Sequence, residues 1–171
     1  DSERLDFTVV ATDTDGDTDR ITLPVTIGDD SPTIRSIDPS STFVVDEDDT
    51  AAGSDSSGAV AVATGSFVTS QGADGVVAYE LVNIADTQNG LTSNGQAVTI
   101  SEVNGVAGAT TYQGVAGGQV IFTLVLSDNG DYTYTQFKAL DHAQNSDTLT
   151  IPFDVVAIDK DNDTSPAVRL L

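Results

Sequence analysis

Aspartates occupy every second position in one short segment near the N-terminus. The segment "DTDGDTD" follows the apolar run "FTVVA" and contains Asp13, Asp15, Asp17 and Asp19. Carboxylates this close repel one another and raise each other's pKa unless a cation or hydrogen-bond donors neutralise them. Calcium binds about 6–8 oxygen ligands and tolerates irregular geometry. The spacing therefore predicts a calcium loop; the alternative is a tight turn whose carboxylates accept hydrogen bonds from backbone N–H groups.

Other metals fit the composition less well than calcium. Magnesium needs a near-ideal octahedron, and zinc prefers His and Cys ligands, whereas the chain has a single His and no Cys. The loop is not an EF-hand either. Counting Asp13 as position 1, the glycine falls at position 4 and position 12 is Pro24, where an EF-hand has its glycine at position 6 and Glu at position 12.

A near-copy of this segment lies at the other end of the chain. "FTVVATDTDGDT" at 7–18 aligns without gaps to "FDVVAIDKDNDT" at 153–164, an offset of 146 residues (153 − 7). An offset this long suits a repeated domain rather than a short solenoid unit. The copy predicts a second calcium loop, in which Asn replaces the glycine and Ser replaces the fourth aspartate. Its ligands are Asp159, Asp161 and Asp163.

A third acidic group, "DEDD", begins at Asp46 and Glu47, directly after an apolar pair. One interpretation is a charged edge that discourages aggregation between strands. The other joins Asp46 and Glu47 with Asp29 and Asp30 in a single cation site. Such a site would lock the angle between two successive domains.

The charge and composition exclude several classes of partner. The chain has 27 acidic and 6 basic residues, a net charge of −21, so nucleic acid and anionic lipid surfaces would be repelled. No apolar run approaches the roughly 18 residues needed to cross a bilayer, which predicts no membrane insertion. The lone His142 and the absence of a nucleophile motif predict that the protein is not an enzyme.

Short runs rich in Val, Thr, Ile, Phe and Tyr predict an all-β fold. Asp-Gly and Asn-Gly turn signals separate many of these runs, and only one turn of helix is suggested, around "QFKALDHAQN". The pattern predicts an antiparallel β-sandwich of the immunoglobulin-like or cadherin-like kind. The expected strands are 5–12, 20–27, 42–45, 59–64, 76–84, 96–101, 119–126, 130–137 and 148–158.

The repeat offset also predicts how the chain is divided into domains. Residues 1–28 are expected to be the closing strands of a preceding repeat, 29–33 a linker stiffened by Pro32, and 34–171 one nearly complete sandwich. At the same offset Leu171 corresponds to Val25, inside the last strand of the repeat.

Taken together, these elements resemble the repeats of about 143 residues found in giant type I-secreted bacterial adhesins of the RTX group. Each element is short, but their order is characteristic and they extend over nearly the whole chain. The elements are "DDSP" at 29–32, "VDEDD" at 45–49, "GADG" at 72–75, "NGDYTY" at 129–134, "LDH" at 140–142 and the two terminal aspartate loops.

The resemblance implies an extracellular module at the surface of a Gram-negative cell. It implies a structural extender that projects a distal binding region for attachment or biofilm formation, with calcium at its loops and domain junctions. The partners would be neighbouring repeats of the same chain, each a monomeric module in a tandem array. An alternative is a calcium-dependent ligand- or carbohydrate-binding sandwich in the same kind of adhesin.

Overall fold

The computed structural model describes residues 2–41, 43–54, 60–103 and 105–170. It divides the chain into two compact units, Asp1–Asp30 and Ser31–Leu171, which we call unit 1 and unit 2. The division falls inside the segment 29–33 that the sequence predicts to be a linker. No helix in the described part of the chain has the length and hydrophobicity needed to cross a bilayer.

Unit 1 is a single hairpin of two long antiparallel strands, β1 (Ser2–Thr12) and β2 (Thr18–Gly28). Their register pairs Phe7 with Leu23 and Val9 with Ile21, and residues paired in this way point to the same face of the hairpin. One face is therefore apolar, yet its side chains are exposed, including Phe7 at 50% and Ile21 at 69%. A two-stranded hairpin alone buries little of such a face.

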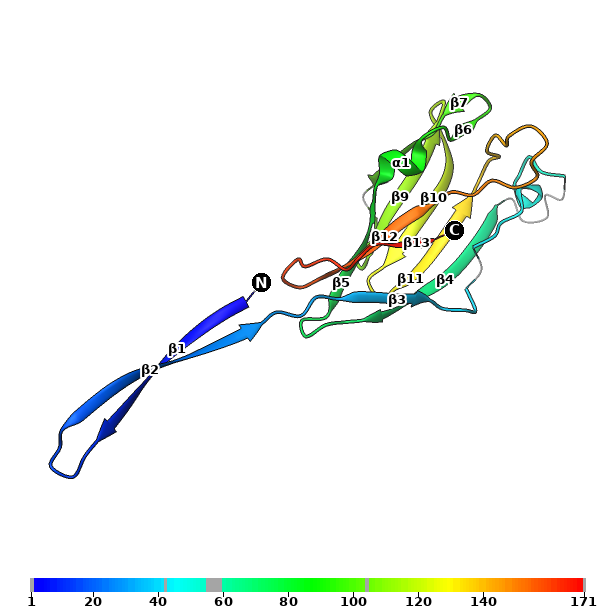
Figure 1. Cartoon of the computed structure of the whole chain (residues 1–171). Coiled ribbons are helices and arrows are strands. Elements are labelled where there is room, and N and C mark those ends of the chain that lie inside the picture. The colour runs from blue at the N-terminus through cyan, green and yellow to red at the C-terminus, as the bar shows by residue number, and fades with distance from the viewer. Residues whose placement is uncertain (1, 42, 55–59, 104, 171) are drawn as a thin grey trace. The chain divides into compact units, whose positions relative to one another are not determined.

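Unit 2 is an antiparallel β-sandwich, which confirms the predicted all-β fold (Figure 1). The order in its larger sheet is β3-β4-β11-β10-β9-β8 and in its smaller sheet β13-β12-β5. The strands of the larger sheet are β3 (Thr33–Ile37), β4 (Ala61–Ser70), β8 (Thr99–Val103), β9 (Ala109–Ala116), β10 (Gln119–Ser127) and β11 (Asp131–Gln136). The smaller sheet contains β5 (Val76–Val82), β12 (Phe153–Asp159) and β13 (Val168–Leu170). The remaining elements are η1 (Glu47–Asp49), α1 (Ile84–Gln88), β6 (Thr92–Ser93) and β7 (Gln96–Ala97).

Aromatic rings join the two layers of the sandwich. Phe122 and Tyr134 lie in the larger sheet, and their ring centroids are 5.9 and 6.1 Å from that of Phe153 in β12. Phe122 is fully buried, and Phe153 is 1% exposed. Because aromatic side chains bury the largest apolar areas, this cluster is the centre of the core.

The structure differs from the predicted strands in several places. Residues 43–45 form no strand, and β12 begins at Phe153 rather than at 148. Residues 42 and 59, the first of two predicted strands, lie outside the described part of the chain. No helix forms over 136–145, and within the described ranges the one α-helix is α1.

The strand β9 was missed because its sequence, "ATTYQGVA", contains small residues and a glycine. A Cβ at Gly114 would overlap the ring of Phe122 on the neighbouring strand. Glycine weakens a strand by itself but permits this close approach. The strand β3 was also missed; it has only five residues.

A charged pair joins β12 to β13. Asp154 is paired with Arg169 in the strand register, and both oxygens of its carboxylate accept hydrogen bonds from the guanidinium, at 2.7 and 2.8 Å. Hydrogen bonding to Arg169 is the main reason that the pKa of Asp154 lies below its usual value. The carboxylate is largely buried, with Asp154 8% exposed.

The substitution Asp154→Asn should lower the melting temperature at pH 7, by about 3 °C for the loss of one charge-assisted bond. Because the folded-state pKa is depressed, this stabilisation is present above the unfolded pKa of about 4 and is lost as pH falls through the folded value. Melting curves of both proteins from pH 7 down to pH 2 should therefore converge. A difference that stays constant over this range would contradict the assignment.

Candidate metal centre

The first aspartate loop, between β1 and β2, is a tight turn organised by the side chain of Asp13. Its Oδ1 accepts hydrogen bonds from the N–H groups of Asp15 (3.2 Å) and Asp17 (2.9 Å). The N–H of Asp13 donates to the carbonyl of Asp17 at 3.0 Å and closes the turn. Gly16 has a φ of 97°, a conformation that glycine adopts without strain. The alternative predicted from the sequence, a tight turn whose carboxylate accepts backbone hydrogen bonds, is therefore confirmed for the backbone of this loop.

The carboxylates of this loop also converge. Asp13, Asp15 and Asp17 each offer an oxygen, and these oxygens lie within 4.8 Å of one another. The pKa of Asp13 is lowered, first by hydrogen bonding with the Asp15 side chain and further by the backbone N–H donors. All three residues are exposed. An all-oxygen, carboxylate-only donor set suits a hard cation such as calcium, so these residues fit the predicted metal.

The second loop, between β12 and β13, repeats the same turn. The N–H of Asp159 donates to the carbonyl of Asp163 at 3.1 Å, and the N–H of Asp163 donates to Asp159 Oδ1 at 2.8 Å. Asn162, which replaces the glycine, also has a positive φ, of 74°. Asn tolerates this region better than most residues. The same turn therefore forms with Asn162 in place of the glycine.

The carboxylates of the second loop have different surroundings from those of the first. Asp159 is 1% exposed, and Asp163 Oδ2 accepts a hydrogen bond from Ser31 Oγ at 3.4 Å. The three carboxylates are not gathered as in the first loop. Instead, carboxylate oxygens of Asp161 and Asp74 lie within 4.8 Å of each other. Asp74 received no ligand role from the sequence, because its Asp-Gly pair indicated only a turn.

Three other predicted ligands are Asp19, near the end of the first loop, and Asp29 and Asp30 in the linker. Asp19 Oδ1 accepts from the N–H of Arg20 at 2.8 Å, and the convergent group of its loop is Asp13, Asp15 and Asp17. Asp29 Oδ1 accepts from the N–H of Asp30 at 2.9 Å. Asp30 is exposed.

The remaining two predicted ligands, Asp46 and Glu47, lie at the end of unit 2 where β4 begins and β11 ends. Glu47 Oε1 accepts hydrogen bonds from Gln136 Nε2 (2.5 Å) and the N–H of Leu140 (2.8 Å), and Asp46 caps η1 by accepting from the N–H of Asp48 at 3.0 Å. Along β4, Gln136 is paired with the first residue and Thr33 with the last, about 30 Å apart at strand spacing. Within unit 2, residues 46 and 47 are thus at the opposite end of β4 from Thr33.

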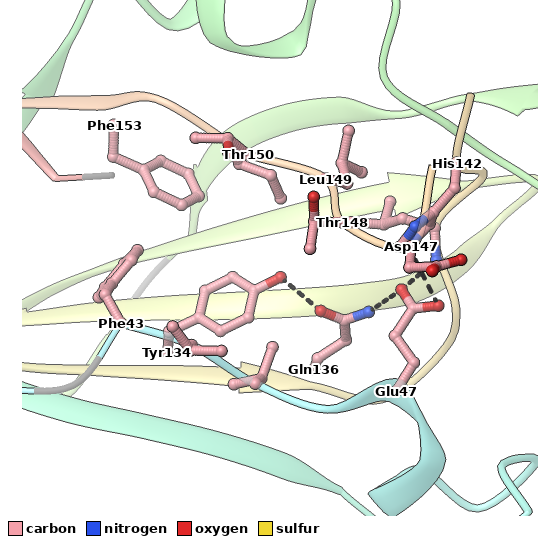
Figure 2. A pocket seen from close by; sticks show the side chains of 14 residues that line it. Phe43, Glu47, Tyr134, Gln136, His142, Asp147, Thr148, Leu149, Thr150 and Phe153 are labelled. Carbon is pink, nitrogen blue, oxygen red and sulfur yellow. Dashed lines mark hydrogen bonds and ion pairs between the residues drawn. The ribbon is translucent and has the colours of Figure 1, made fainter. Parts of the chain in front are cut away.

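Glu47 instead takes part in a polar network at one end of a cavity of about 420 Å³ (Figure 2). Tyr134 donates to Gln136 Oε1 at 3.0 Å, Gln136 donates to Glu47, and His142 Nε2 lies 3.6 Å from Glu47 Oε2. Burial, with a further contribution from the charge of Glu47, raises the pKa of Tyr134. Tyr134 is therefore a neutral hydrogen-bond donor at physiological pH.

The chain belongs to the family described as Domain of unknown function (DUF5801), whose model matches residues 42–169. The match covers nearly all of unit 2, including the second aspartate loop. No curated protein and no solved structure matches the chain.

Substituting Asp159→Ala should destabilise unit 2 by about 1–3 kcal/mol, because it leaves the N–H of Asp163 without its acceptor in a partly buried hydrogen bond. The matched substitution Asp13→Ala removes the same hydrogen bond from an exposed turn in unit 1, and should leave the melting of unit 2 unchanged. Urea unfolding followed by circular dichroism measures both effects. Equal effects of the two substitutions on unit 2 would contradict this structural role of Asp159.

Proposed function

We propose that this protein is an extender module of a large bacterial cell-surface adhesin, stiffened by calcium at its aspartate loops and at its domain junction. The observation that carries the proposal is the turn shared by the two loops, with the same three types of hydrogen bond at positions 146 residues apart. A repeated turn with repeated carboxylates is what a tandem array of cation-stiffened domains requires. The extracellular location, type I secretion and role in attachment or biofilm formation rest on the family resemblance alone.

Asp13, Asp15 and Asp17 would hold the cation of the first loop through their convergent oxygens. In unit 2, Asp74 and Asp161 would contribute carboxylates from the β4–β5 and β12–β13 turns. When bound, calcium neutralises the crowded negative charges and fixes the loop backbone. The chain's own part is to place the carboxylates by backbone hydrogen bonds before the cation arrives.

The second aspartate loop is hydrogen-bonded to the residue that follows the two linker carboxylates. Ser31, the first residue of unit 2, is hydrogen-bonded to Asp163, and Asp29 and Asp30 directly precede it in the chain. The proposal assigns these two linker carboxylates to the junction cation. A cation shared by linker and loop would restrict the angle between successive modules.

Unit 1 takes the role of the closing hairpin of a preceding repeat. Phe7, Val9 and Ala11 correspond at the 146-residue offset to Phe153, Val155 and Ala157, which are at most 1% exposed in β12. In unit 2 the other edge of β12 is paired with β5. The apolar face of unit 1 is therefore the face that a neighbouring sandwich would cover, with a β5-like strand paired to β1.

Calcium should bind to the protein and raise its melting temperature relative to EDTA. Stabilisation at a free calcium concentration 100-fold above Kd is about 2.7 kcal/mol per site linked to folding. The triple variant D13N/D15N/D17N should lose one class of sites in isothermal titration calorimetry. The control D48N/D49N/D86N removes three exposed carboxylates elsewhere and should titrate like the unmodified chain.

An unchanged melting temperature in millimolar calcium would count against calcium as the stiffening agent. X-ray scattering in solution supplies a separate readout of stiffness. For a chain of several repeats, the maximum dimension should increase with calcium and decrease with EDTA. Calcium binding without any change in the maximum dimension would support a calcium-binding protein but contradict the proposed stiffening of the array.

A chain with residues 31–146 placed ahead of residue 1 should fold into two sandwiches, because residue 147 corresponds to residue 1 at the repeat offset. The apolar face of unit 1 would then be buried in the first sandwich. Phe7→Asp with Val9→Asp should abolish only that sandwich, measured as the loss of one set of slowly exchanging amides. The control Thr8→Asp lies on the opposite face of β1 and should preserve both sandwiches.

A further inference from the structure

The Asn-Gly pairs in the turns of unit 2 differ in how their reactive groups are held. Three of the pairs lie in described turns and begin at Asn89, Asn94 and Asn129; a fourth begins at Asn104, which lies outside the described part of the chain. In such a pair the backbone nitrogen of the glycine attacks the side-chain amide carbon of the asparagine, because the glycine has no Cβ to hinder the approach. The nitrogen must lose its proton and the side chain must rotate toward it. A hydrogen bond that holds either group therefore slows the reaction.

The pair Asn94-Gly95 is held by the carboxylate of Asp141. The N–H of Gly95 donates to Asp141 Oδ2 at 2.8 Å, and the N–H of Asn94 donates to Oδ1 at 2.9 Å. Hydrogen bonding from the Gly95 N–H is the first cause of the lowered pKa of Asp141. The carboxylate is therefore ionised at neutral pH. A negative charge at this distance disfavours loss of the Gly95 proton.

The pair Asn129-Gly130 is held at both reacting groups. The N–H of Gly130 donates to the carbonyl of Ser127 at 2.9 Å. The side chain of Asn129 is held by Asp131, whose N–H donates to Asn129 Oδ1 at 3.0 Å and whose carboxylate accepts from Nδ2 at 2.8 Å. Gly130 is also buried. Attack at this pair requires all of these hydrogen bonds to break, each at a cost in free energy.

The pair Asn89-Gly90, directly after α1, has neither restraint. Within the described part of the chain, no hydrogen bond is made by the Gly90 N–H or by the Asn89 side chain. Both residues are exposed. Gly90 has a φ of 76°, and a Cβ at this position would meet no atom of another segment within 4 Å. The Gly90 nitrogen and the Asn89 amide carbon are therefore free to approach each other.

We propose that Asn89 is a site of spontaneous deamidation, and that Asp141 protects Asn94 from the same reaction. The Gly90 nitrogen forms a bond to Asn89 Cγ, the Cγ–Nδ2 bond breaks, and the displaced NH2 group leaves with the N–H proton as ammonia. Water then opens the resulting succinimide ring. Opening at Cγ leaves aspartate, and opening at the main-chain carbonyl leaves isoaspartate, whose main chain runs through Cβ and Cγ. One water enters and one ammonia leaves, with no oxidation or reduction.

Isoaspartate at position 89 alters the turn between α1 and the edge of the larger sheet. Gln88 directly precedes the site, and its Oε1 accepts from the N–H of Ile100 at 2.9 Å. Ile100 lies in β8, the last strand of that sheet. The carbonyl of Gln88 accepts from the N–H of Leu91 at 3.1 Å. Isoaspartate lengthens the main chain between Gln88 and Leu91 by one carbon atom, so the reaction loosens the turn that covers this edge of β8.

The experiment compares the folded full chain with the chain unfolded in concentrated urea, both at mildly alkaline pH. Tandem mass spectrometry measures the mass increase at each asparagine, and enzymatic methylation identifies isoaspartate. In urea the three pairs should react at similar rates, since each is an exposed Asn-Gly pair. In the folded chain Asn89 should react at close to its urea rate, whereas Asn94 and Asn129 should react at least about tenfold more slowly than in urea.

Two substitutions test the assigned roles. Asn89→Gln should abolish the fast reaction, because attack on the longer side chain has to close a larger ring. Asp141→Ala should accelerate the reaction of Asn94 at least about tenfold and leave the rate at Asn89 unchanged. Continued protection of Asn129 in that variant shows that unit 2 is still folded. The control Asp49→Ala removes an exposed carboxylate elsewhere and should change neither rate.

Equal rates at the three pairs of the folded chain would overturn the proposal. A reaction at Asn94 that is faster than at Asn89 would also overturn it, since Asp141 would then promote the attack. An unchanged rate at Asn94 in the folded Asp141→Ala variant would overturn the protective role of the carboxylate. In aged protein, the Ile100 amide should exchange faster with solvent than in fresh protein, and Asn89→Gln should prevent this change.

Discussion

The strand β12 is the element on which the sandwich depends, because it is paired on both edges and ends in an aspartate loop. It lies between β5 and β13 in the smaller sheet, and its residues Phe153, Val155 and Ala157 are at most 1% exposed. Burial of these side chains against the larger sheet is the main stabilising contribution that the layer makes. The same strand leads directly into Asp159, so the position of the loop is determined by the core.

Unit 1 contains the same hairpin without the sandwich, and the comparison separates local from tertiary effects. The turn is formed in both units by the same hydrogen bonds to Asp13 and Asp159, respectively. Local side-chain-to-backbone bonding is therefore sufficient for the turn. The carboxylates behave differently, because burial removes Asp159 from solvent while Asp13 remains exposed beside Asp15 and Asp17.

The acidic segment after residue 45 shows that carboxylates of the kind that bind cations can also hold segments of the chain together by hydrogen bonds. Asp46 and Glu47 have the residue types of a cation site, but the structure uses them to cap η1 and to join β11 with the loop after it. A carboxylate that accepts an N–H bond and a side-chain amide bond in a half-buried position is already satisfied. Charge clustering by itself does not distinguish this role from metal binding.

The sequence by itself determined the all-β class, the hairpins with clear turn signals and the two aspartate turns, because alternation and local hydrogen bonding act over a few residues. It also indicated the repeat, through one offset that aligns Phe7 with Phe153. Only the tertiary structure decided that Asp74 approaches Asp161, and that Glu47 accepts hydrogen bonds from Gln136 and from the N–H of Leu140. These outcomes depend on which strands are neighbours, and strand order is set by packing across the whole sandwich rather than by any short segment.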